Sequence, residues 1–331
     1  MDTTPPKLEH VARLGAGATS TVDLARLTAP WRGLASGTEV AVKRLHAELR
    51  HDQIAQACLY AEAENGARLR HPSLVRVLGA CDDPEGGTML LLAYVPGASL
   101  AERIAAEGPL AEPVVRRLGQ ELAGALTALH AAGLVHGDLK PENVRQDAAG
   151  RAVLLDLGLA RAVGRAAAPA GGSLLYLSPE RARGEPAGPP SDVFALGLVL
   201  YELATGAHPC DPRGGGLKGG GLGRTSGRVL RKAIEEAGAD AFLARLATGR
   251  IQAPSALAPE LSPFIDAVLL AALSRAPEER PAAGELAIAL ADGEAGRWWR
   301  ERSGAAGAIH RPTGLELPLV GRDSTTSFQR A

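Results

Sequence analysis

The sequence predicts an α+β protein with two lobes, a small antiparallel-sheet lobe with one key helix and a larger helical lobe. In the first part of the chain, residues 22–24 and 40–43 alternate in polarity with the period of a half-buried strand. Further along, apolar residues recur three and four positions apart, as on one face of a helix. These residues are Val115, Leu118, Leu122, Leu126 and Leu129. Residues 193–203 are apolar nearly all round, which predicts a helix at the centre of the large lobe.

The bulk composition narrows the class of protein. The 331 residues are 46% hydrophobic and 22% charged, as in a soluble globular protein, and the net charge of −1 offers no basic excess for nucleic acid. The first residues lack the basic-then-apolar pattern of a secretory signal, and no apolar stretch reaches the roughly 18 residues of a membrane helix. The three cysteines show no C-x-x-C spacing. We therefore expect a cytoplasmic protein that binds neither nucleic acid nor membrane.

In the small lobe, a glycine-rich segment and a lysine indicate a phosphate site. Residues 15–22, Gly-Ala-Gly-Ala-Thr-Ser-Thr-Val, lie between two strand signals, and glycines let backbone amides approach phosphate oxygens. A glycine turn in a hairpin is the simpler interpretation of this segment alone. On the strand 40–43, however, Ala41 and Lys43 point to the same face. A small residue there can cap an adenine, and the lysine can reach the α- and β-phosphates.

The helix after that strand offers a partner for the lysine. Leu59, Glu62, Gly66 and Leu69 are spaced three and four apart, so Glu62 lies on the face that packs inward. Glu64 is turned about 200° away and should be solvated. An acid on an apolar face needs a partner to offset its desolvation. We therefore expect Glu62 to pair with Lys43.

The large lobe carries the most informative pattern. Residues 136–143 read His-Gly-Asp-Leu-Lys-Pro-Glu-Asn, and the apolar strand 152–155 then delivers Asp156 in Asp-Leu-Gly. An acid, a base and an amide thus precede one strand, and a second acid follows the next. This layout can hold Mg²⁺ and a nucleoside triphosphate while a hydroxyl attacks the γ-phosphate.

On these residues the chain resembles the eukaryotic-like (Hanks-type) bacterial serine/threonine protein kinases. Residues 172–180 look like the family's peptide-docking segment, with Ser-Pro-Glu in place of Ala-Pro-Glu. Residues 191–197 look like the central helix whose acid, Asp192, braces the catalytic loop, and Arg280 stands where the family's arginine pairs with Glu180. The resemblance implies a bilobal protein-kinase-like fold over residues 8–292, with an N-lobe at about 8–92 and a C-lobe at about 96–302.

The resemblance also implies a role for each site residue. Asp138 would act as base, Lys140 would neutralise the transferring phosphoryl group, and Asn143 and Asp156 would hold Mg²⁺, or alternatively Mn²⁺. ATP would lie against a set of small-lobe and hinge residues. These are Leu14, Gly15, Gly17, Val22, Ala41, Lys43, Ala93 and Val95. Ser173 and Glu180 would serve substrate docking. The implied partners are protein substrates, and the sequence is compatible with a homodimer without indicating one.

The chain departs from the family's pattern at several positions. Ser20 replaces the third glycine of the phosphate loop, and Gly137 replaces the arginine that reads a phosphate on the activation loop. Residues 157–172 agree with that loss, because they contain no Ser, Thr or Tyr. Arg145 stands where the family puts an apolar floor under the adenine. Either its stem lies along the base or nucleotide affinity is reduced.

Two other functions stay open. His-Gly-Asp also resembles the small-molecule phosphotransferases of the aminoglycoside and choline kinase type, which lack the Lys-Pro-Glu, the Ser-Pro-Glu segment and the buried helix found here. The other alternative is a pseudokinase scaffold, which Arg145 favours and the retained polar residues at 43, 62, 138, 143 and 156 oppose. Outside the domain, residues 211–227 read as a flexible glycine-rich insertion and residues 303–331 as a linker or disordered tail.

Overall fold

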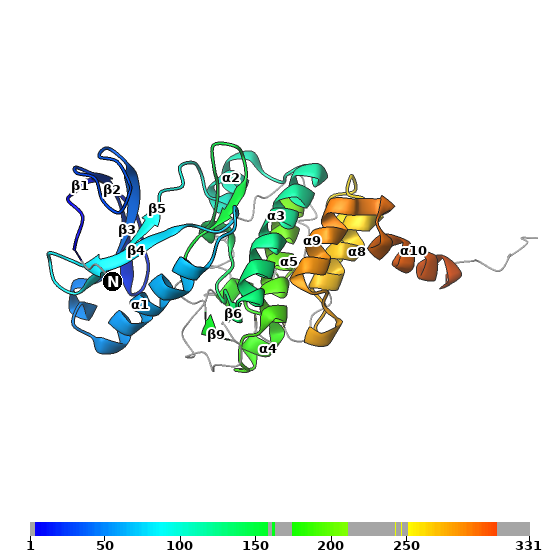
Figure 1. The fold of residues 1–331 in the computed structure, drawn as a ribbon. Coiled ribbons are helices and arrows are strands. Elements are labelled where there is room, and N and C mark those ends of the chain that lie inside the picture. The colour runs from blue at the N-terminus through cyan, green and yellow to red at the C-terminus, as the bar shows by residue number, and fades with distance from the viewer. Residues whose placement is uncertain are drawn as a thin grey trace, which may run out of the picture.

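A small sheet lobe and a larger helical lobe lie side by side in the computed structural model (Figure 1). The structure describes residues 4–157, 161–162, 174–210, 242, 246 and 251–309. The expected insertion at 211–227, the docking residue Ser173 and the chain after 309 lie outside these described residues.

The small lobe is a five-stranded antiparallel sheet in the order β1-β2-β3-β5-β4. Its strands are β1 (Leu8–Ala16), β2 (Ser20–Leu27), β3 (Glu39–Leu45), β4 (Val77–Asp82) and β5 (Thr88–Ala93). After a short 3₁₀ turn at Ala47–Leu49, the helix α1 (Gln53–Arg68) begins where the Asp52 side chain accepts a hydrogen bond from the Ala55 backbone, 2.7 Å away. The predicted antiparallel sheet with one helix is confirmed.

Both faces of this sheet are covered, and the two faces differ in what they contact. Lys43 pairs with Val22 across β2–β3 and with Leu90 across β3–β5, so these side chains share one face. That face joins the main apolar core, which continues through the large lobe. The alternate residues, such as Val40 and Val42, pack in a second and smaller cluster on the other face. The sheet therefore presents Lys43 toward the large lobe.

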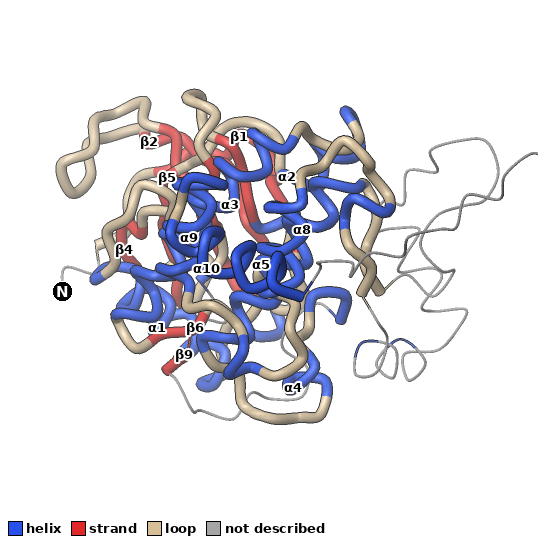
Figure 2. The backbone as a smooth tube through the Cα atoms, turned by 90° about the vertical axis from the view of Figure 1, so that its right-hand side faces the viewer, coloured by secondary structure: helices blue, strands red, loops and turns tan. Residues whose placement is uncertain are grey.

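The large lobe is built around two helices that the sequence identified. Its helices are α2 (Leu100–Glu107), α3 (Glu112–Ala131), α4 (Pro179–Ala182), α5 (Pro189–Thr205), α8 (Pro263–Ala272), α9 (Ala283–Asp292) and α10 (Arg297–Ile309). The predicted face of α3 is fully buried, and every residue of α5 from Ser191 to Thr205 is buried. Helices α3, α8 and α9 pack around α5 (Figure 2).

Short elements connect the two lobes and complete the large one. Two-stranded ladders pair β6 (Leu134–Val135) with β9 (Arg161–Ala162) and β7 (Val144–Gln146) with β8 (Ala152–Leu154). Short 3₁₀ turns are the remaining elements. They lie at Pro141–Asn143, Leu174–Tyr176, Pro254–Ala256, Pro277–Glu279 and Gly293–Ala295. The β7–β8 hairpin carries the predicted catalytic residues at its ends.

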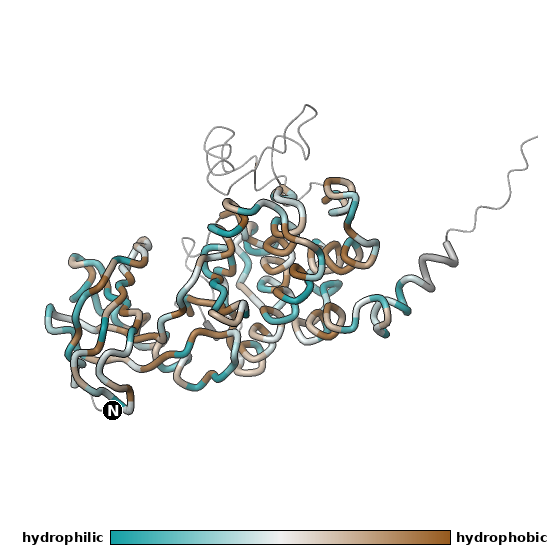
Figure 3. The backbone as a smooth tube through the Cα atoms, turned by 90° about the horizontal axis from the view of Figure 1, so that it is seen from above, coloured by the Kyte–Doolittle hydropathy of each residue, from teal (hydrophilic) through white to brown (hydrophobic). Residues whose placement is uncertain are grey.

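The end of the large lobe corrects one sequence-based boundary. Helix α10 runs to Ile309, past residue 302 where the linker was expected to begin. The rings of Trp298 and Trp299 stand edge-on to Phe264 of α8, with centroids 6.3 and 5.8 Å apart, and this contact holds the start of α10 on the lobe. The next residues of α10, Arg300 to Ser303, are polar and lead away from the body of the lobe (Figure 3).

Helices that cross a membrane must be both long and apolar, and the described helices differ from them. None of those in the described ranges combines the length and the apolar character needed to cross a membrane.

Candidate active site

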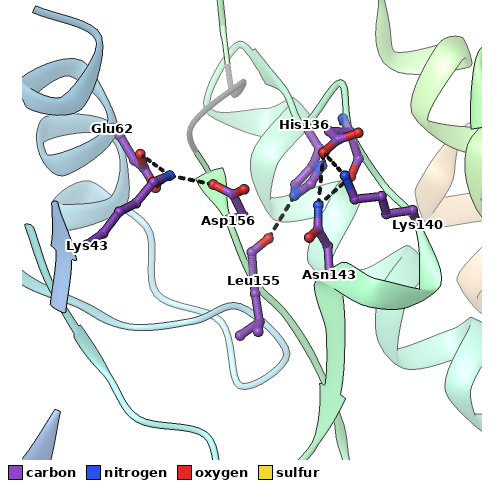
Figure 4. A network of polar contacts seen from close by, with 8 residues as sticks. Lys43, Glu62, His136, Lys140, Asn143, Leu155 and Asp156 are labelled. Atoms are coloured by element: carbon purple, nitrogen blue, oxygen red, sulfur yellow. Dashed lines mark hydrogen bonds and ion pairs between the residues drawn. The ribbon is translucent and has the colours of Figure 1, made fainter. Parts of the chain in front are cut away.

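Lys43 and Glu62 form a buried ion pair between the sheet and α1. The Lys43 Nζ lies 2.8 Å from Glu62 Oε2 and 3.1 Å from Oε1 (Figure 4). Glu62 is 3% exposed, whereas Glu64 is exposed, as the helical spacing predicts. The predicted partnership is therefore confirmed in the structure.

The charges of this pair support one another. Burial alone would lower the pKa of Lys43, but the carboxylates of Glu62 and Asp156 raise it above its ordinary value. Burial raises the pKa of Glu62, and the ammonium of Lys43 opposes that rise. The lysine therefore stays protonated, and its ammonium faces Asp156. A polyphosphate bound beside Asp156 would contact the same positive charge.

Asp156 follows β8 and reaches back to the sheet. Its Oδ1 lies 2.6 Å from Lys43 Nζ, and its side chain is 45% exposed. Its backbone has φ of 54°, a left-handed conformation that Asp adopts more readily than most residues. The hairpin fixes the position of Asp156 relative to Asn143, because the N–H of the preceding residue, Leu155, donates to the Asn143 carbonyl over 2.7 Å. Residues 143 and 156 are thereby brought to the same end of the hairpin.

Asp138, Lys140 and Asn143 form a second polar group on the large lobe (Figure 4). Lys140 Nζ lies 2.6 Å from Asp138 Oδ2, and Asn143 Nδ2 donates to the same oxygen over 3.1 Å and to the Asp138 carbonyl over 2.9 Å. These contacts fix the rotamer of the Asp138 carboxylate. The amide nitrogen of Asn143 is directed at Asp138, so its Oδ1 is the atom left to face a cation.

The backbone of the catalytic loop is fastened to the buried helix α5. Asp192, 1% exposed, accepts hydrogen bonds from the N–H groups of His136 (2.8 Å) and Gly137 (2.9 Å), and it also lies 2.9 Å from His130 Nε2. Gly137 has φ of 77°, so glycine is the residue with least strain at this position. The backbone conformation at residue 137 therefore favours glycine over the arginine that the family usually has there.

The donor set fits Mg²⁺. No group of three or more His, Cys, Asp or Glu capable of holding a metal occurs in the part of the chain that the structure describes. Mg²⁺ in phosphoryl-transfer sites, however, is commonly bound by one or two carboxylates together with substrate phosphates and water. Asp156 and Asn143 supply a carboxylate and an amide oxygen, and Lys43 adds charge for the phosphates. Such a site would bind its metal together with the nucleotide.

The expected nucleotide residues lie on the sheet and at its junction with the large lobe. Ala41 is 8% exposed in the main core, and Leu14, Val22 and Val95 are partly buried against that core. Ala93 ends β5, Gly15 is an exposed residue of β1 that pairs with Val22 of β2, and Gly17 lies in the exposed turn that follows β1. A Cβ added to Gly15 would have no neighbour within 4 Å, so the space beside this end of β1 is open. The expected residues thus come from four adjacent strands, β1, β2, β3 and β5, from the turn after β1 and from the junction that follows β5.

Arg145 occupies the floor position in β7 and is partly exposed. Its Nη1 donates to the Gly97 carbonyl, just after the junction of the lobes. The same residue forms a bridge with Ser99, which caps α2. The charged end is therefore held by the junction backbone rather than directed into the site.

Glu180, which the family resemblance assigns to substrate docking, is held by Arg280 of the large lobe. The two form a bidentate pair, Nη1–Oε1 at 2.7 Å and Nη2–Oε2 at 2.8 Å, and both are nearly buried. Burial raises the pKa of Glu180, but the hydrogen bonds and charge of Arg280 outweigh it and bring the value to about 2. The predicted pairing across the large lobe is confirmed.

Several contributing residues were missed at the sequence level. His136 Nε2 bonds the Leu155 carbonyl over 3.1 Å, His46 Nε2 bonds the Gly17 carbonyl over 2.8 Å, and Tyr176 donates to the buried Glu202 over 2.6 Å. Burial raises the pKa of Glu202 to about 7, against the lowering effect of the Tyr176 bond. No spacing rule links these partners. The only signal in the sequence is Glu202 itself, because an acid inside the apolar helix α5 predicts a buried hydrogen-bond partner.

Comparison with known proteins places this geometry in context. The model of the protein kinase domain matches residues 8–287. Serine/threonine-protein kinase PknB of Mycobacterium tuberculosis is 33% identical over 276 residues, covering 81% of this chain and 39% of that protein. A probable serine/threonine-protein kinase of Corynebacterium efficiens is 32% identical over 294 residues, covering 86% of this chain and 41% of its own length.

A third similar protein, a probable serine/threonine-protein kinase of Streptomyces coelicolor, is 32% identical over 253 residues. That match covers 74% of this chain and 34% of the relative. The chain thus spans well under half the length of the curated relatives that it matches.

Proposed function

We propose that this chain, which belongs to the protein kinase family, transfers the γ-phosphoryl group of ATP to serine and threonine hydroxyls of proteins. One observation carries the proposal. The cationic Lys43, tied to Glu62, lies 2.6 Å from Asp156, and Asp138 is held by Lys140 and Asn143 on the facing lobe. This arrangement supports a nucleotide-binding half on the small lobe and an acceptor-binding half on the large lobe.

The residues divide the reaction between them. Lys43 would orient the α- and β-phosphates, and Glu62 keeps the lysine in position. Asn143 and Asp156 would hold Mg²⁺, which supplies charge neutralisation on the phosphates when it is bound. Asp138 would orient the acceptor hydroxyl and take its proton, while Lys140 would neutralise the charge on the transferring phosphoryl group. The acceptor oxygen would thus lose its proton to Asp138 as it forms the new bond to the γ-phosphorus, while the bond between that phosphorus and the bridging oxygen breaks and ADP leaves.

The two alternative functions predict different acceptors or none. Small-molecule phosphotransferases would not need the Glu180–Arg280 pair beneath a peptide-docking segment, and both residues are buried and bonded here. A pseudokinase would not need all five polar residues in contact. Arg145, the observation that favoured a pseudokinase, is bonded to Gly97 at the edge of the site. These features support a protein acceptor and an active enzyme.

The cellular setting is also a proposal. We propose that the domain works in the cytoplasm, where ATP is available, on protein substrates and without nucleic acid or membrane as ligand. Cys58, Cys81 and Cys210 are all free thiols, which supports a reducing compartment. We also propose a role in signal transduction, since phosphorylation of a protein changes its charge and can order or disrupt a segment of it.

The acceptor class can be tested directly. The chain is incubated with γ-labelled ATP and Mg²⁺ or Mn²⁺, using myelin basic protein, an aminoglycoside and choline as separate acceptors, with Lys43→Met as the inactive control. We expect label on the protein as phosphoserine or phosphothreonine, with no phosphotyrosine. Efficient labelling of the aminoglycoside or choline with the protein ignored would favour the small-molecule class, and no transfer to any acceptor would favour the scaffold.

Control by loop phosphorylation is not expected. Residues 157–172 offer no hydroxyl, and Gly137 cannot bind a phosphate. Exhaustive phosphatase treatment of the purified chain should therefore leave the rate of transfer within about twofold of the untreated enzyme. Mass spectrometry should map any autophosphorylation elsewhere, such as residues 324–327. A large loss of activity traced to Ser173, Tyr176 or Ser178 would contradict this expectation.

A further inference from the structure

We propose that His208 is a positioning residue for the protein acceptor, because it anchors the docking segment, residues 174–180, to the end of α5. The inference rests on the proposed protein kinase function. His208 is outside the set of nucleotide, metal and proton-transfer residues, and it lies three residues after α5 ends. Its side chain is directed at the segment over which a protein acceptor would lie.

The hydrogen bonds of His208 define its tautomer. The ring is in a residue only 3% exposed, and its Nδ1 accepts a hydrogen bond from the Cys210 backbone N–H over 3.1 Å. The ring proton must therefore lie on Nε2, which is 2.8 Å from the carbonyl oxygen of Leu175. His208 is thus a donor to the backbone of the docking segment, oriented by its own turn.

The neighbouring residue of the segment is held from the same side. The Tyr176 ring stands edge-on to the His208 ring, with centroids 5.8 Å apart and planes at 80°. The Tyr176 hydroxyl donates to Glu202 of α5 over 2.6 Å. Phe242 packs on the His208 ring at 6.0 Å between centroids. Two consecutive segment residues are therefore bonded to side chains at one end of the buried helix.

The turn that carries His208 is itself well fixed. Gly206 closes α5 with φ of 69°, and a Cβ there would meet Pro109 at 3.0 Å. The Thr205 hydroxyl oxygen accepts a hydrogen bond from the Ala207 N–H over 3.2 Å. The imidazole therefore projects from a constrained support rather than from a loose loop, and it can transmit that constraint to Leu175.

The hydrogen bond from His208 to the docking segment can replace an arginine–phosphate contact that this chain lacks. In many kinases new contacts between arginine and a phosphate order this region, and here Gly137 and the hydroxyl-free residues 157–172 remove both halves of that contact. His208 holds the segment at Leu175, and Arg280 holds it at Glu180. The docking segment is thereby fixed at both ends by side chains of the large lobe.

The test compares His208→Phe with His208→Gln in the full chain, using myelin basic protein as acceptor. Phe keeps an aromatic ring beside Tyr176 but cannot donate to Leu175. The Gln amide can still donate, so it is the matched rescue variant. For His208→Phe we expect the acceptor KM to rise about tenfold, equivalent to roughly 1.4 kcal/mol, with the KM for ATP within about twofold of wild type. His208→Gln should recover most of the acceptor KM.

Hydrogen–deuterium exchange separates positioning from a general loss of stability. In His208→Phe, exchange should rise at residues 174–178 and stay at the wild-type level in β3, α1 and the catalytic loop. An unchanged acceptor KM, or an equal rise in both KM values with exchange increased throughout the large lobe, would overturn the proposal. A wild-type chain that labels no protein would instead contradict the proposed function, and the exchange experiment would still decide whether His208 holds the segment.

Discussion

Replacing Asp138 with Asn is expected to slow phosphoryl transfer by about 10²–10⁴-fold while ATP stays bound with wild-type affinity. Asn has the size of Asp and keeps an oxygen that can accept from Lys140 or Asn143, which now contact the carboxylate at 2.6 and 3.1 Å. It cannot take a proton from the acceptor hydroxyl. Lys43, which we propose to contact the nucleotide, and its partner Glu62 lie on the other lobe and should be unaffected.

Single-turnover transfer of labelled phosphate and a separate nucleotide-binding titration would measure the two effects. Lys43→Met and Asp156→Ala are the matched controls, because each removes a nucleotide or metal contact and should abolish transfer with the fold intact. If the Asp138 variant transferred phosphate at the wild-type rate, the assignment of the base would be wrong.

Replacing Arg280 with Met is expected to lower the free energy of unfolding by about 3–5 kcal/mol. The change leaves Glu180 buried without its bidentate partner, and it also removes the donors to the Pro190 and Ser274 carbonyls, at 2.9 and 2.7 Å. The double variant Glu180→Gln/Arg280→Met removes the unpaired charge and should recover part of the loss. Urea denaturation of the wild type and of the two variants measures these differences.

The same pair predicts a pH dependence. The pKa of Glu180 is about 2 in the folded chain, below its ordinary value of 4.5. The pair therefore contributes its full stability above about pH 4.5 and loses it as the pH falls toward 2. In Arg280→Met the free energy of unfolding should therefore lack the part of the decrease between about pH 4.5 and pH 2 that comes from this pair. A wild-type curve that matches the Arg280→Met curve below pH 4.5 would contradict this reading.

The local parts of the fold could be predicted from the sequence because short-range periodicity determines them. The spacing along α1 placed Glu62 inward and Glu64 outward, and the alternation along β3 put Lys43 and Ala41 on one face. The motif spacing identified Asp138, Asn143 and Asp156, because the hairpin between them is short enough to be fixed by local hydrogen bonds. The Glu180–Arg280 contact, by contrast, was predicted from the family resemblance.

The remaining contacts depend on tertiary packing that no local pattern records. His208 meets Leu175, and Arg145 meets Gly97, only because separate segments converge on the large lobe. Helix α10 continues past residue 302, and its start is packed on α8 by two tryptophans, a contact that the polar, alanine- and glycine-rich segment after them does not reveal. Sequence periodicity describes one element at a time, and these contacts join two.

The attachment of the catalytic loop to Asp192 has a consequence for the working cycle. Asp192 belongs to a helix whose residues are all buried from Ser191 to Thr205, so the positions of His136 and Gly137 inherit the stiffness of the lobe's interior. The Lys43–Asp156 contact, in contrast, spans the two lobes. If the lobes part to admit a nucleotide or release a product, we expect this bridge to separate, while Asp138 and its partners Lys140 and Asn143 stay together within the large lobe.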